Sequence, residues 1–226
     1  MFERLVQEAP QFFGYHNLVF IGQAMGRTLW MTLIGCGVGF VCGLFIAIIR
    51  QTQTRILMPV RLLVIVYVEF FRRIPFLVIL FIVLFAIEPL IPGTSLLGIA
   101  TVSVCLLSTA FLSEVIRSGL ESVPRQQIEG AATLNFSFIQ MMSMVILPQS
   151  WRVILPPAAA FIVMFIKDTS LASQLGVIEL TFAGKMLVNR GFSPILGFGA
   201  ILLCYFMLSY PLSRFAAYLE KRLESS

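Results

Sequence analysis

The fold of this chain is decided by one polar stretch, SVPRQQIEGAATLNFSFIQMMSMVILP, which covers residues 122–148 and lies between two long apolar runs. Ser122 is suited to cap a helix, and Pro124 falls in the first turn, where a missing N–H costs nothing. Asn135 lies where this helix should end, because Asn adopts the left-handed conformation of a helix C-cap more readily than most residues. These signals predict a first short helix outside the bilayer.

A second short helix is predicted directly after the first. Ser137 and Gln140 have the S-x-x-Q spacing of a capping box, in which each side chain accepts a hydrogen bond from the backbone of the other residue. Pro148 is expected to end this helix, because proline cannot continue the hydrogen-bonding ladder. Residues 122–148 are therefore predicted to form a helical hairpin. The small residues of its first arm would let the backbone of a partner approach closely.

The hairpin resembles the EAA loop of permease subunits of ABC importers. Glu129-Gly130-Ala131 takes the positions of E-A-A, Asn135 replaces a later Gly, and Ile146-Leu147-Pro148 closes the motif. Gly130 departs from the Ala of the family pattern, which weakens the arm by about 1 kcal/mol. The resemblance implies that the loop couples the membrane helices to an ATPase. The coupling residues would be Glu129, Gly130, Ala131, Asn135, Ile146 and Pro148.

Two further motifs extend the resemblance to the polar amino acid permeases of this class. The sequence YVEFFRRIP at residues 67–75 is similar to their Y-x-E-x-F-R-x-x-P signature, and IKDTSL at residues 166–171 is similar to their K-D-T-S-L. The resemblance implies a subunit that moves polar or charged amino acids across the membrane. It also implies partners: two ATP-binding cassette subunits, a second permease subunit that is identical or paralogous, and an extracytoplasmic solute-binding protein.

The composition indicates an all-α protein that crosses a lipid bilayer several times. Hydrophobic residues make up 58% of the 226, and charged residues only 12%, against about 25% charged residues in a soluble domain. One span takes about 20 residues, so a single permease domain over residues 1–226 has room for about five spans. These are predicted near 28–49, 62–87, 96–116, 153–166 and 195–215. We expect 62–87 to be one long helix with a kink near Pro75.

The first predicted span is rich in glycine, at Gly35, Gly37, Gly39 and Gly43. Small residues at near-regular spacing favour close contact between helices in lipid. The alternative is that glycine is simply more frequent in membrane helices, and the sequence leaves both interpretations open.

Neither enzymatic nor metal-binding chemistry is predicted. The sequence contains no G-x-x-x-x-G-K-[ST] loop, so we expect no cofactor on this chain and ATP-Mg on a partner ATPase. Its single histidine belongs to no Cys/His cluster with metal-ligand spacing, and the cysteines lie in apolar runs as packing residues. The basic residues are scattered among apolar runs, which argues against binding to nucleic acid.

Three charged residues interrupt the second predicted span: Glu69, Arg72 and Arg73. Charges at membrane depth must pair or line a cavity. Glu69 lies one helical turn before the two arginines, so we expect an internal ion pair and a structural role of the three residues, shared with the subunit interface. A role in the solute pathway is the alternative.

Lys167, Asp168, Thr169 and Ser170 are the best candidates for a solute pathway. They follow the fourth predicted span, where a broken helix past mid-membrane would offer a carboxylate, an ammonium and two hydroxyls to the zwitterionic head of an amino acid. The alternative is that Lys167 and Asp168 pair with each other or anchor the outer interface. Glu114, near the end of the third predicted span, is a weaker candidate.

The excess of Lys and Arg predicts that the C-terminal tail and the hairpin lie in the cytoplasm. Five spans then put the N-terminus outside, as in a multi-pass protein of the cytoplasmic membrane of a prokaryote. Closure of an ATPase pair would move the hairpins and open the spans outward, which is alternating access. The alternative function is a stand-alone secondary carrier or channel, which needs no ATPase. The sequence does not identify the amino acid.

Overall fold

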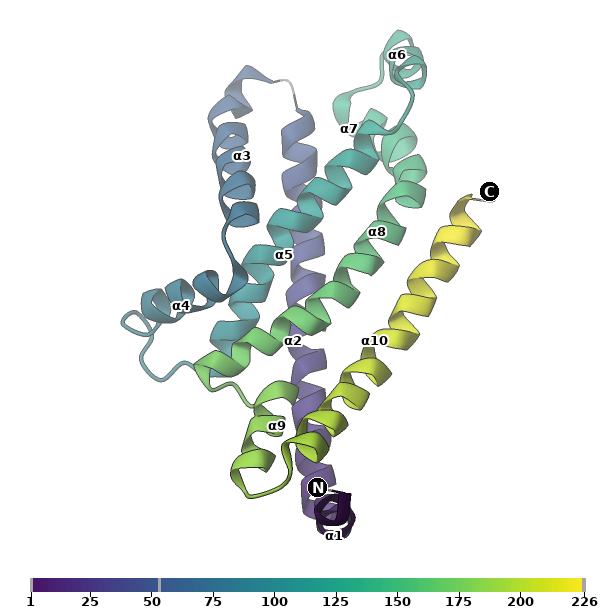
Figure 1. The fold of residues 1–226 in the computed structure, drawn as a ribbon. Coiled ribbons are helices and arrows are strands. Elements are labelled where there is room, and N and C mark those ends of the chain that lie inside the picture. Colours follow the sequence, from purple (N-terminus) through teal and green to yellow (C-terminus); the bar gives the residue numbers. More distant parts are fainter. Residues whose placement is uncertain (1, 53, 225–226) are drawn as a thin grey trace. The chain divides into compact units, whose positions relative to one another are not determined.

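The computed structural model describes residues 2–52 and 54–224, and every regular element within these ranges is helical (Figure 1). Apolar segments become helices because a backbone in lipid must satisfy its own N–H and C=O groups. The elements are, in chain order, α1 (Phe2–Phe12), α2 (Tyr15–Gln51), η1 (Arg55–Leu57), α3 (Met58–Arg73), α4 (Phe76–Ile87), α5 (Leu96–Glu121), α6 (Arg125–Thr133), α7 (Phe138–Met141), η2 (Met142–Ile146), α8 (Leu147–Asp168), η3 (Thr169–Leu175), α9 (Leu180–Asn189) and α10 (Pro194–Glu224).

The prediction of an all-α membrane protein with about five spans is confirmed. Within the described residues, four helical stretches are long and apolar enough to cross a membrane, and the broken pair α3 and α4 makes a fifth candidate. The helices extend beyond the predicted spans into their polar flanks. The first stretch is Tyr15–Gln51 rather than 28–49, and the fourth is Phe138–Leu175 rather than 153–166.

The second predicted span is not one helix, and the prediction of a continuous helix over 62–87 is wrong. α3 ends at Arg73 and α4 begins at Phe76. Between them, Ile74 has the extended backbone angles φ −97° and ψ 135°, and Pro75 has φ −59° and ψ 138°. The ring of a proline disfavours a helical conformation in the residue before it. Pro75 therefore ends α3 at this point rather than kinking a continuous helix.

Pro148 does not end the second arm of the hairpin, and that prediction is wrong too. α7, the π-helical turn η2 and α8 follow one another without a gap, so the second arm and the fourth span are one helix. The Leu147 amide donates to the Met142 carbonyl, which is the wider spacing of a π-turn. Pro148 follows this turn as the second residue of α8. The side-chain amide of Gln149 donates to the nearby Val145 carbonyl at 2.9 Å.

The chain divides into two compact units, and α2, α5, α8 and α10 each contribute residues to both. Each unit combines segments that lie far apart in the sequence. Unit 1 consists of Met1–Gly35, Pro75–Val104 and Val163–Pro211, and unit 2 consists of Cys36–Ile74, Cys105–Ile162 and Leu212–Ser226.

In unit 1, a buried carboxylate organises the start of α9. The Glu179 side chain is fully buried and accepts hydrogen bonds from the Phe182 amide at 2.7 Å, the Thr181 amide at 2.9 Å and the Tyr205 hydroxyl at 2.8 Å. Burial raises the pKa of the Glu179 carboxyl, and the hydrogen bonds oppose this rise. Glu179 is therefore an N-cap that also ties α9 to α10.

In unit 2, α2 and α5 approach so closely that their contact leaves no room for side chains. A Cβ atom at Gly43 would lie 2.9 Å from the backbone nitrogen of Ser113, and one at Gly39 would lie 2.9 Å from that of Thr109. These two glycines thus serve close helix contact, which was one of the two interpretations that the sequence left open, whereas Gly37 faces open space. Beside this contact is the core cluster of unit 2: Ala47, Ile116, Leu120, Val123, Met142, Ile146 and Ile154.

Candidate functional site

The first arm of the hairpin is α6, and it begins differently from the prediction. Pro124 occupies the N-cap position with the extended angles φ −58° and ψ 135°. Ser122 does not cap α6. Its hydroxyl instead donates to the carbonyl of Gly119 at 2.7 Å, at the end of α5. The capping hydroxyl thus serves the preceding helix, and the restricted backbone of Pro124 starts the new one.

The turn between the two arms depends on Asn135, as the sequence predicts. Asn135 has a φ of 59° and is the non-glycine residue with a positive φ in the described part of the chain. The Phe136 amide donates to the Ala131 carbonyl at 3.2 Å, and the Asn135 amide donates to the Ala132 carbonyl at 3.0 Å. This pair of bonds is a Schellman motif, which satisfies the last carbonyls of α6. Replacement of the family's Gly by Asn therefore preserves the turn.

The second arm starts with the predicted capping box. The Gln140 amide donates to the Ser137 hydroxyl at 3.3 Å, and the Ser137 amide donates to the Gln140 side-chain oxygen at 2.9 Å. Two backbone donors at the start of α7 are thereby satisfied. Because both arms have capped ends at the turn, the hairpin is a defined structure rather than a loose loop (Figure 1).

The predicted coupling residues divide into an anchoring set and an exposed set. Ala131 is 6% exposed and Ile146 is 8% exposed, and Ile146 belongs to the core cluster of unit 2. Glu129, Gly130 and Asn135 are exposed. The hairpin is therefore fixed to unit 2 on one side and offers a carboxylate and bare backbone on the other.

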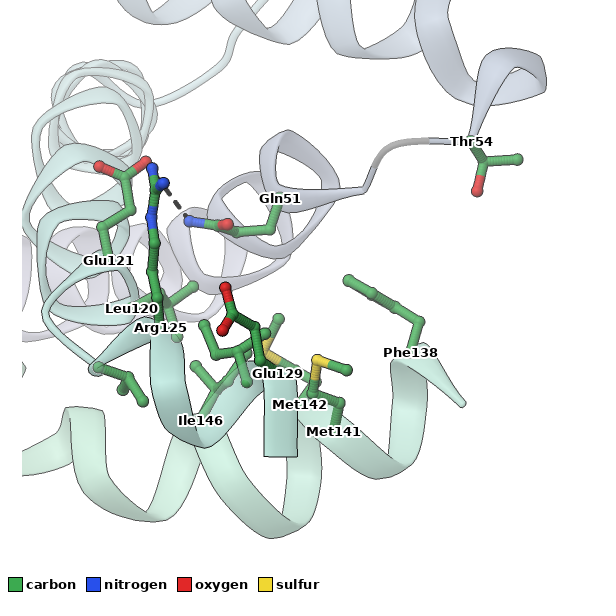
Figure 2. A pocket seen from close by; sticks show the side chains of 12 residues that line it. Gln51, Thr54, Leu120, Glu121, Arg125, Glu129, Phe138, Met141, Met142 and Ile146 are labelled. Atoms are coloured by element: carbon green, nitrogen blue, oxygen red, sulfur yellow. Dashed lines mark hydrogen bonds between the residues drawn. The ribbon is translucent and has the colours of Figure 1, made fainter. Parts of the chain in front are cut away.

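A cleft of about 1070 Å³ lies beside the hairpin, entirely within unit 2 (Figure 2). Figure 2 shows the Glu129 side chain entering it from α6, with Glu121 and Arg125 nearby. Its other wall is apolar and includes two methionines, which adapt their shape to different contacts. The lining residues are Gln51, Thr54, Leu120, Glu121, Val123, Arg125, Ile128, Glu129, Phe138, Met141, Met142 and Ile146.

Glu114, predicted as a weaker member of the solute pathway, lies at the centre of an ion network in unit 2. Its carboxylate accepts a hydrogen bond from Arg50 of α2 at 2.7 Å and also pairs with Arg117 of α5. Arg72 of α3 lies 3.8 Å from the same carboxylate. Arg117 pairs in addition with Glu121. Both carboxylate oxygens of Glu114 are thus occupied by arginines of its own unit.

The three charges of the second span separate into two environments. Arg73 and Glu69 form the expected ion pair at 2.7 Å on α3, and both side chains are well exposed. Arg72 does not share this pair. Its guanidinium lies over the ring of Phe111, 5.7 Å from the centroid, and points to Glu114. The expected internal pair is therefore present, but it takes up only Arg73, and Arg72 is directed to Glu114 instead.

The predicted solute-pathway residues 167–170 lie at the junction of α8 and η3 in unit 1. The sequence predicts a broken helix at this place, but the chain remains helical and tightens from an α-helix to a 3₁₀ helix at Thr169. Thr169 is buried, and its hydroxyl donates to the Ile166 carbonyl at 2.8 Å, so it is not offered to a solute. Lys167 is exposed and Asp168 is half-buried, and no ion pair joins them among the residues that the structure describes.

Several polar residues of these sites were not found from the sequence. Arg117 and Glu121 follow Glu114 at helical spacing, and this i, i+3 and i, i+4 pattern could have revealed them. Arg50 had no such signal, because its partner Glu114 lies 64 positions away, and the contact of Glu179 with Tyr205 is likewise distant in the sequence.

Known protein families and solved structures show which proteins this chain is similar to in sequence and fold. The family model described as "Binding-protein-dependent transport system inner membrane component" matches residues 39–225. The solved "amino acid ABC transporter with histidines" has the same fold, with a TM-score of 0.82 over 98% of both chains and 23% sequence identity. A methionine ABC transporter, MetNI, in an inward-facing conformation has a TM-score of 0.80 over 93% of this chain and 99% of its own, with 20% identity.

Curated relatives are similar over almost their entire length. A probable glutamine ABC transporter permease protein of Bacillus subtilis (strain 168), GlnM, is 32% identical over 88% of this chain and 91% of its own. A probable amino-acid ABC transporter permease protein of the same organism, YckA, is 33% identical over 90% and 88%. An L-cystine transport system permease protein, TcyL, is 31% identical over 88% and 85%. This chain therefore belongs to the family of inner membrane components, or permeases, of binding-protein-dependent ABC transport systems.

Proposed function

We propose that this permease moves polar or charged amino acids into the cell, and that the hairpin 122–148 is the surface through which a partner ATPase drives it. Relatives with at least 30% identity are named as glutamine, amino-acid and L-cystine permeases, which supports the substrate class. Family membership argues against the alternative of a stand-alone carrier or channel. The observation that carries the proposal is the doubly capped hairpin, anchored inside and exposed outside.

The anchoring explains how such a hairpin would transmit force. Ile146 lies in the core cluster, and the second arm continues into the fourth span as one helix. A push on the exposed face of α6 would therefore move a long helix rather than deform a loop. Glu129 supplies a charge on that face for a basic residue of the partner. ATP-Mg would be bound by two ATP-binding cassette subunits and not by this chain.

The remaining partners and the orientation are part of the same proposal. The permease would pair with a second copy or a paralogue, and an extracytoplasmic solute-binding protein would deliver the amino acid. The hairpin and the C-terminal tail would lie in the cytoplasm, and the N-terminus outside. The exposed Lys167 and the half-buried Asp168 and Ser170 remain the candidates for contact with the solute. Thr169 and Glu114 are engaged elsewhere.

The coupling role is tested with the charge reversal Glu129→Lys in the complete transporter, reconstituted in liposomes. We expect the complex to assemble and to hydrolyse ATP, while the uptake of amino acid per ATP falls at least tenfold, because hydrolysis is no longer linked to the spans. The matched control is Glu220→Lys, an exposed charge reversal on α10 outside the hairpin, which should leave uptake unchanged. Normal uptake by Glu129→Lys would contradict the coupling role.

The orientation is tested separately by labelling a single cysteine placed at Gln126, an exposed residue of α6. The four native cysteines, of which Cys42 is exposed, must first be replaced by Ser. An impermeant maleimide should label position 126 only after the inner face of the membrane is made accessible. Labelling of intact cells from outside would exclude an ATPase at the hairpin.

A further inference from the structure

We propose that Arg72 is a positioning residue for transport, because its contact with Glu114 links the hairpin cleft to the break in the second span. This inference rests on the proposed coupling function of the hairpin. It concerns a different set of residues, none of which belongs to the EAA-like motif. The argument has three steps: the path of the network, its charge balance and the weakness of one contact.

The network connects three helices through a single carboxylate. Arg50 of α2 and Arg72 of α3 approach the same oxygen, Oε2, of Glu114 at 2.7 and 3.8 Å. Arg117 binds the other oxygen, Oε1, through its Nε at 3.0 Å. The four side chains that meet at this carboxylate, those of Arg50, Arg72, Glu114 and Arg117, are 14 to 35% exposed. Water therefore screens these charges less than it screens surface pairs, and the helices are held in one arrangement.

The two ends of the network lie at the hairpin cleft and at the C-terminal end of α3. At one end, Arg117 pairs with Glu121, whose Oε1 accepts a hydrogen bond from Gln51 at 3.5 Å (Figure 2). Glu121 and Gln51 both line the cleft into which Glu129 projects. At the other end, Arg72 is the last but one residue of α3, directly before the break at Ile74-Pro75. A displacement of the hairpin thus has a continuous polar route to the break.

The charge balance singles out Arg72. Three guanidinium groups, of Arg50, Arg72 and Arg117, face two carboxylates, of Glu114 and Glu121. Without Arg72 the remaining four groups balance, two cations against two anions. Charge balance among the other four groups therefore does not require Arg72, whose guanidinium also lies over the face of Phe111. A cation that the charge balance leaves in excess needs another reason to lie at this depth.

The Arg72–Glu114 contact is also the longest in the network. At 3.8 Å it lies beyond hydrogen-bond distance, whereas the Arg50 contact at 2.7 Å is a hydrogen bond. A small movement of α3 relative to α5 would shorten it to a hydrogen bond or separate the pair. Arg72 therefore changes partners most easily when the hairpin moves. Arg50 and Arg117 keep Glu114 in place.

The test compares Arg72→Gln with Arg73→Gln in the complete transporter in liposomes. Arg73 is the neighbouring arginine on α3, and its pair with Glu69 lies outside the network. We expect Arg72→Gln to assemble, to keep the wild-type melting temperature and to hydrolyse ATP, but to transport at least tenfold less amino acid per ATP. Arg73→Gln should keep the wild-type ratio. A wild-type ratio in Arg72→Gln, or an equal loss in both variants, would overturn the proposal.

A double-mutant comparison separates transmission from a merely structural role. If Arg72 acts through Glu114, the double variant Arg72→Gln/Glu114→Gln should have a transport ratio no lower than that of Glu114→Gln alone. If the reductions in amino acid transported per ATP by the two single variants multiply in the double variant, Arg72 does not act through Glu114. If Glu114→Gln does not assemble, Arg72→Lys is measured instead. Lysine keeps the positive charge but replaces the planar guanidinium with a compact ammonium, so we expect an intermediate amount of amino acid transported per ATP. A wild-type amount would refute the role of the guanidinium.

The same measurements distinguish this inference from the proposed function. A loss in Glu129→Lys with a normal Arg72→Gln would refute only the network. Normal transport in Glu129→Lys would refute the coupling role of the hairpin, whatever Arg72→Gln does.

Discussion

The contact between α2 and α5 and the first arm of the hairpin both contain glycine, but in opposite surroundings. Gly43 of α2 is buried, and a Cβ atom there would meet the backbone of α5 at 2.9 Å. Gly130 of α6 is exposed, and nothing lies within 4 Å of the place where its Cβ would be. Both residues cost helix stability relative to Ala. Only Gly43 regains that cost by packing within this chain.

The difference teaches how to interpret glycine in a membrane permease. In the α2–α5 contact, the absence of a side chain lets two backbones approach, and dispersion forces between them hold the helices together in lipid. In α6 the same absence leaves a bare strip of backbone on an exposed face. Under the proposed function, that strip is free for the ATPase. The comparison yields three predictions, from the largest expected effect to the smallest.

The largest effect is expected from Gly43→Val. The added side chain must displace the backbone of α5 near Ser113, and overpacking of this kind costs on the order of 3 kcal/mol. The purified transporter should lose most of its monodisperse fraction and melt at a lower temperature. Gly37→Val on the same helix is the control, since Gly37 faces open space. If Gly43→Val and Gly37→Val lower the monodisperse fraction and the melting temperature equally, the α2–α5 contact is not the reason for the effect at Gly43.

A smaller effect is expected at the turn of the hairpin. Asn135→Val places a β-branched residue at φ 59°, which costs about 1–2 kcal/mol. Hydrogen exchange of residues 122–148 should accelerate about tenfold. Asn135→Gly, which restores the family residue, should leave exchange unchanged.

The control for this turn is Leu134→Val. The neighbouring Leu134 is exposed and has an ordinary φ of −83°. Faster exchange in Leu134→Val would attribute the effect to the valine side chain and not to the left-handed backbone.

The smallest effect is expected from Gly130→Ala, and it has the opposite sign. The substitution restores the E-A-A pattern and should stabilise α6 by about 1 kcal/mol, which slows hydrogen exchange of this arm about fivefold. No steric conflict arises within the chain. Faster exchange would mean that Gly130 fulfils a need inside the permease and would remove the contrast with Gly43.

Local signals in the sequence predicted the turn and the capping box of the hairpin correctly, because each depends on hydrogen bonds between residues at most five positions apart. Asn135 and the Ser137–Gln140 box are of this kind. Ser122 misled the prediction because a hydroxyl near two helix ends can serve either one. The glycines of α2 were ambiguous for another reason: Gly37 and Gly43 look alike until the neighbouring helix is known.

The two prolines 75 and 148 show the same limit. The sequence predicted a kink at Pro75 and a helix end at Pro148, yet α3 ends before Pro75, while the helix around Pro148 continues through a π-turn. Helix propensity describes the free-energy cost of a proline, but not whether the helix ends at the proline or continues past it through a π-turn.

By itself, the sequence determined that this chain is an all-helical membrane protein with a capped polar hairpin. Those properties follow from hydrophobic length and from short-range hydrogen bonding, which residues carry with them into any fold. Only the tertiary structure decided which charges meet. Arg50 and Glu114 are 64 positions apart, and Arg72 lies near Glu114 although Glu69 is its neighbour on the same helix. Ion pairs between helices depend on how the helices pack, and packing is a property of the assembled unit rather than of any one segment.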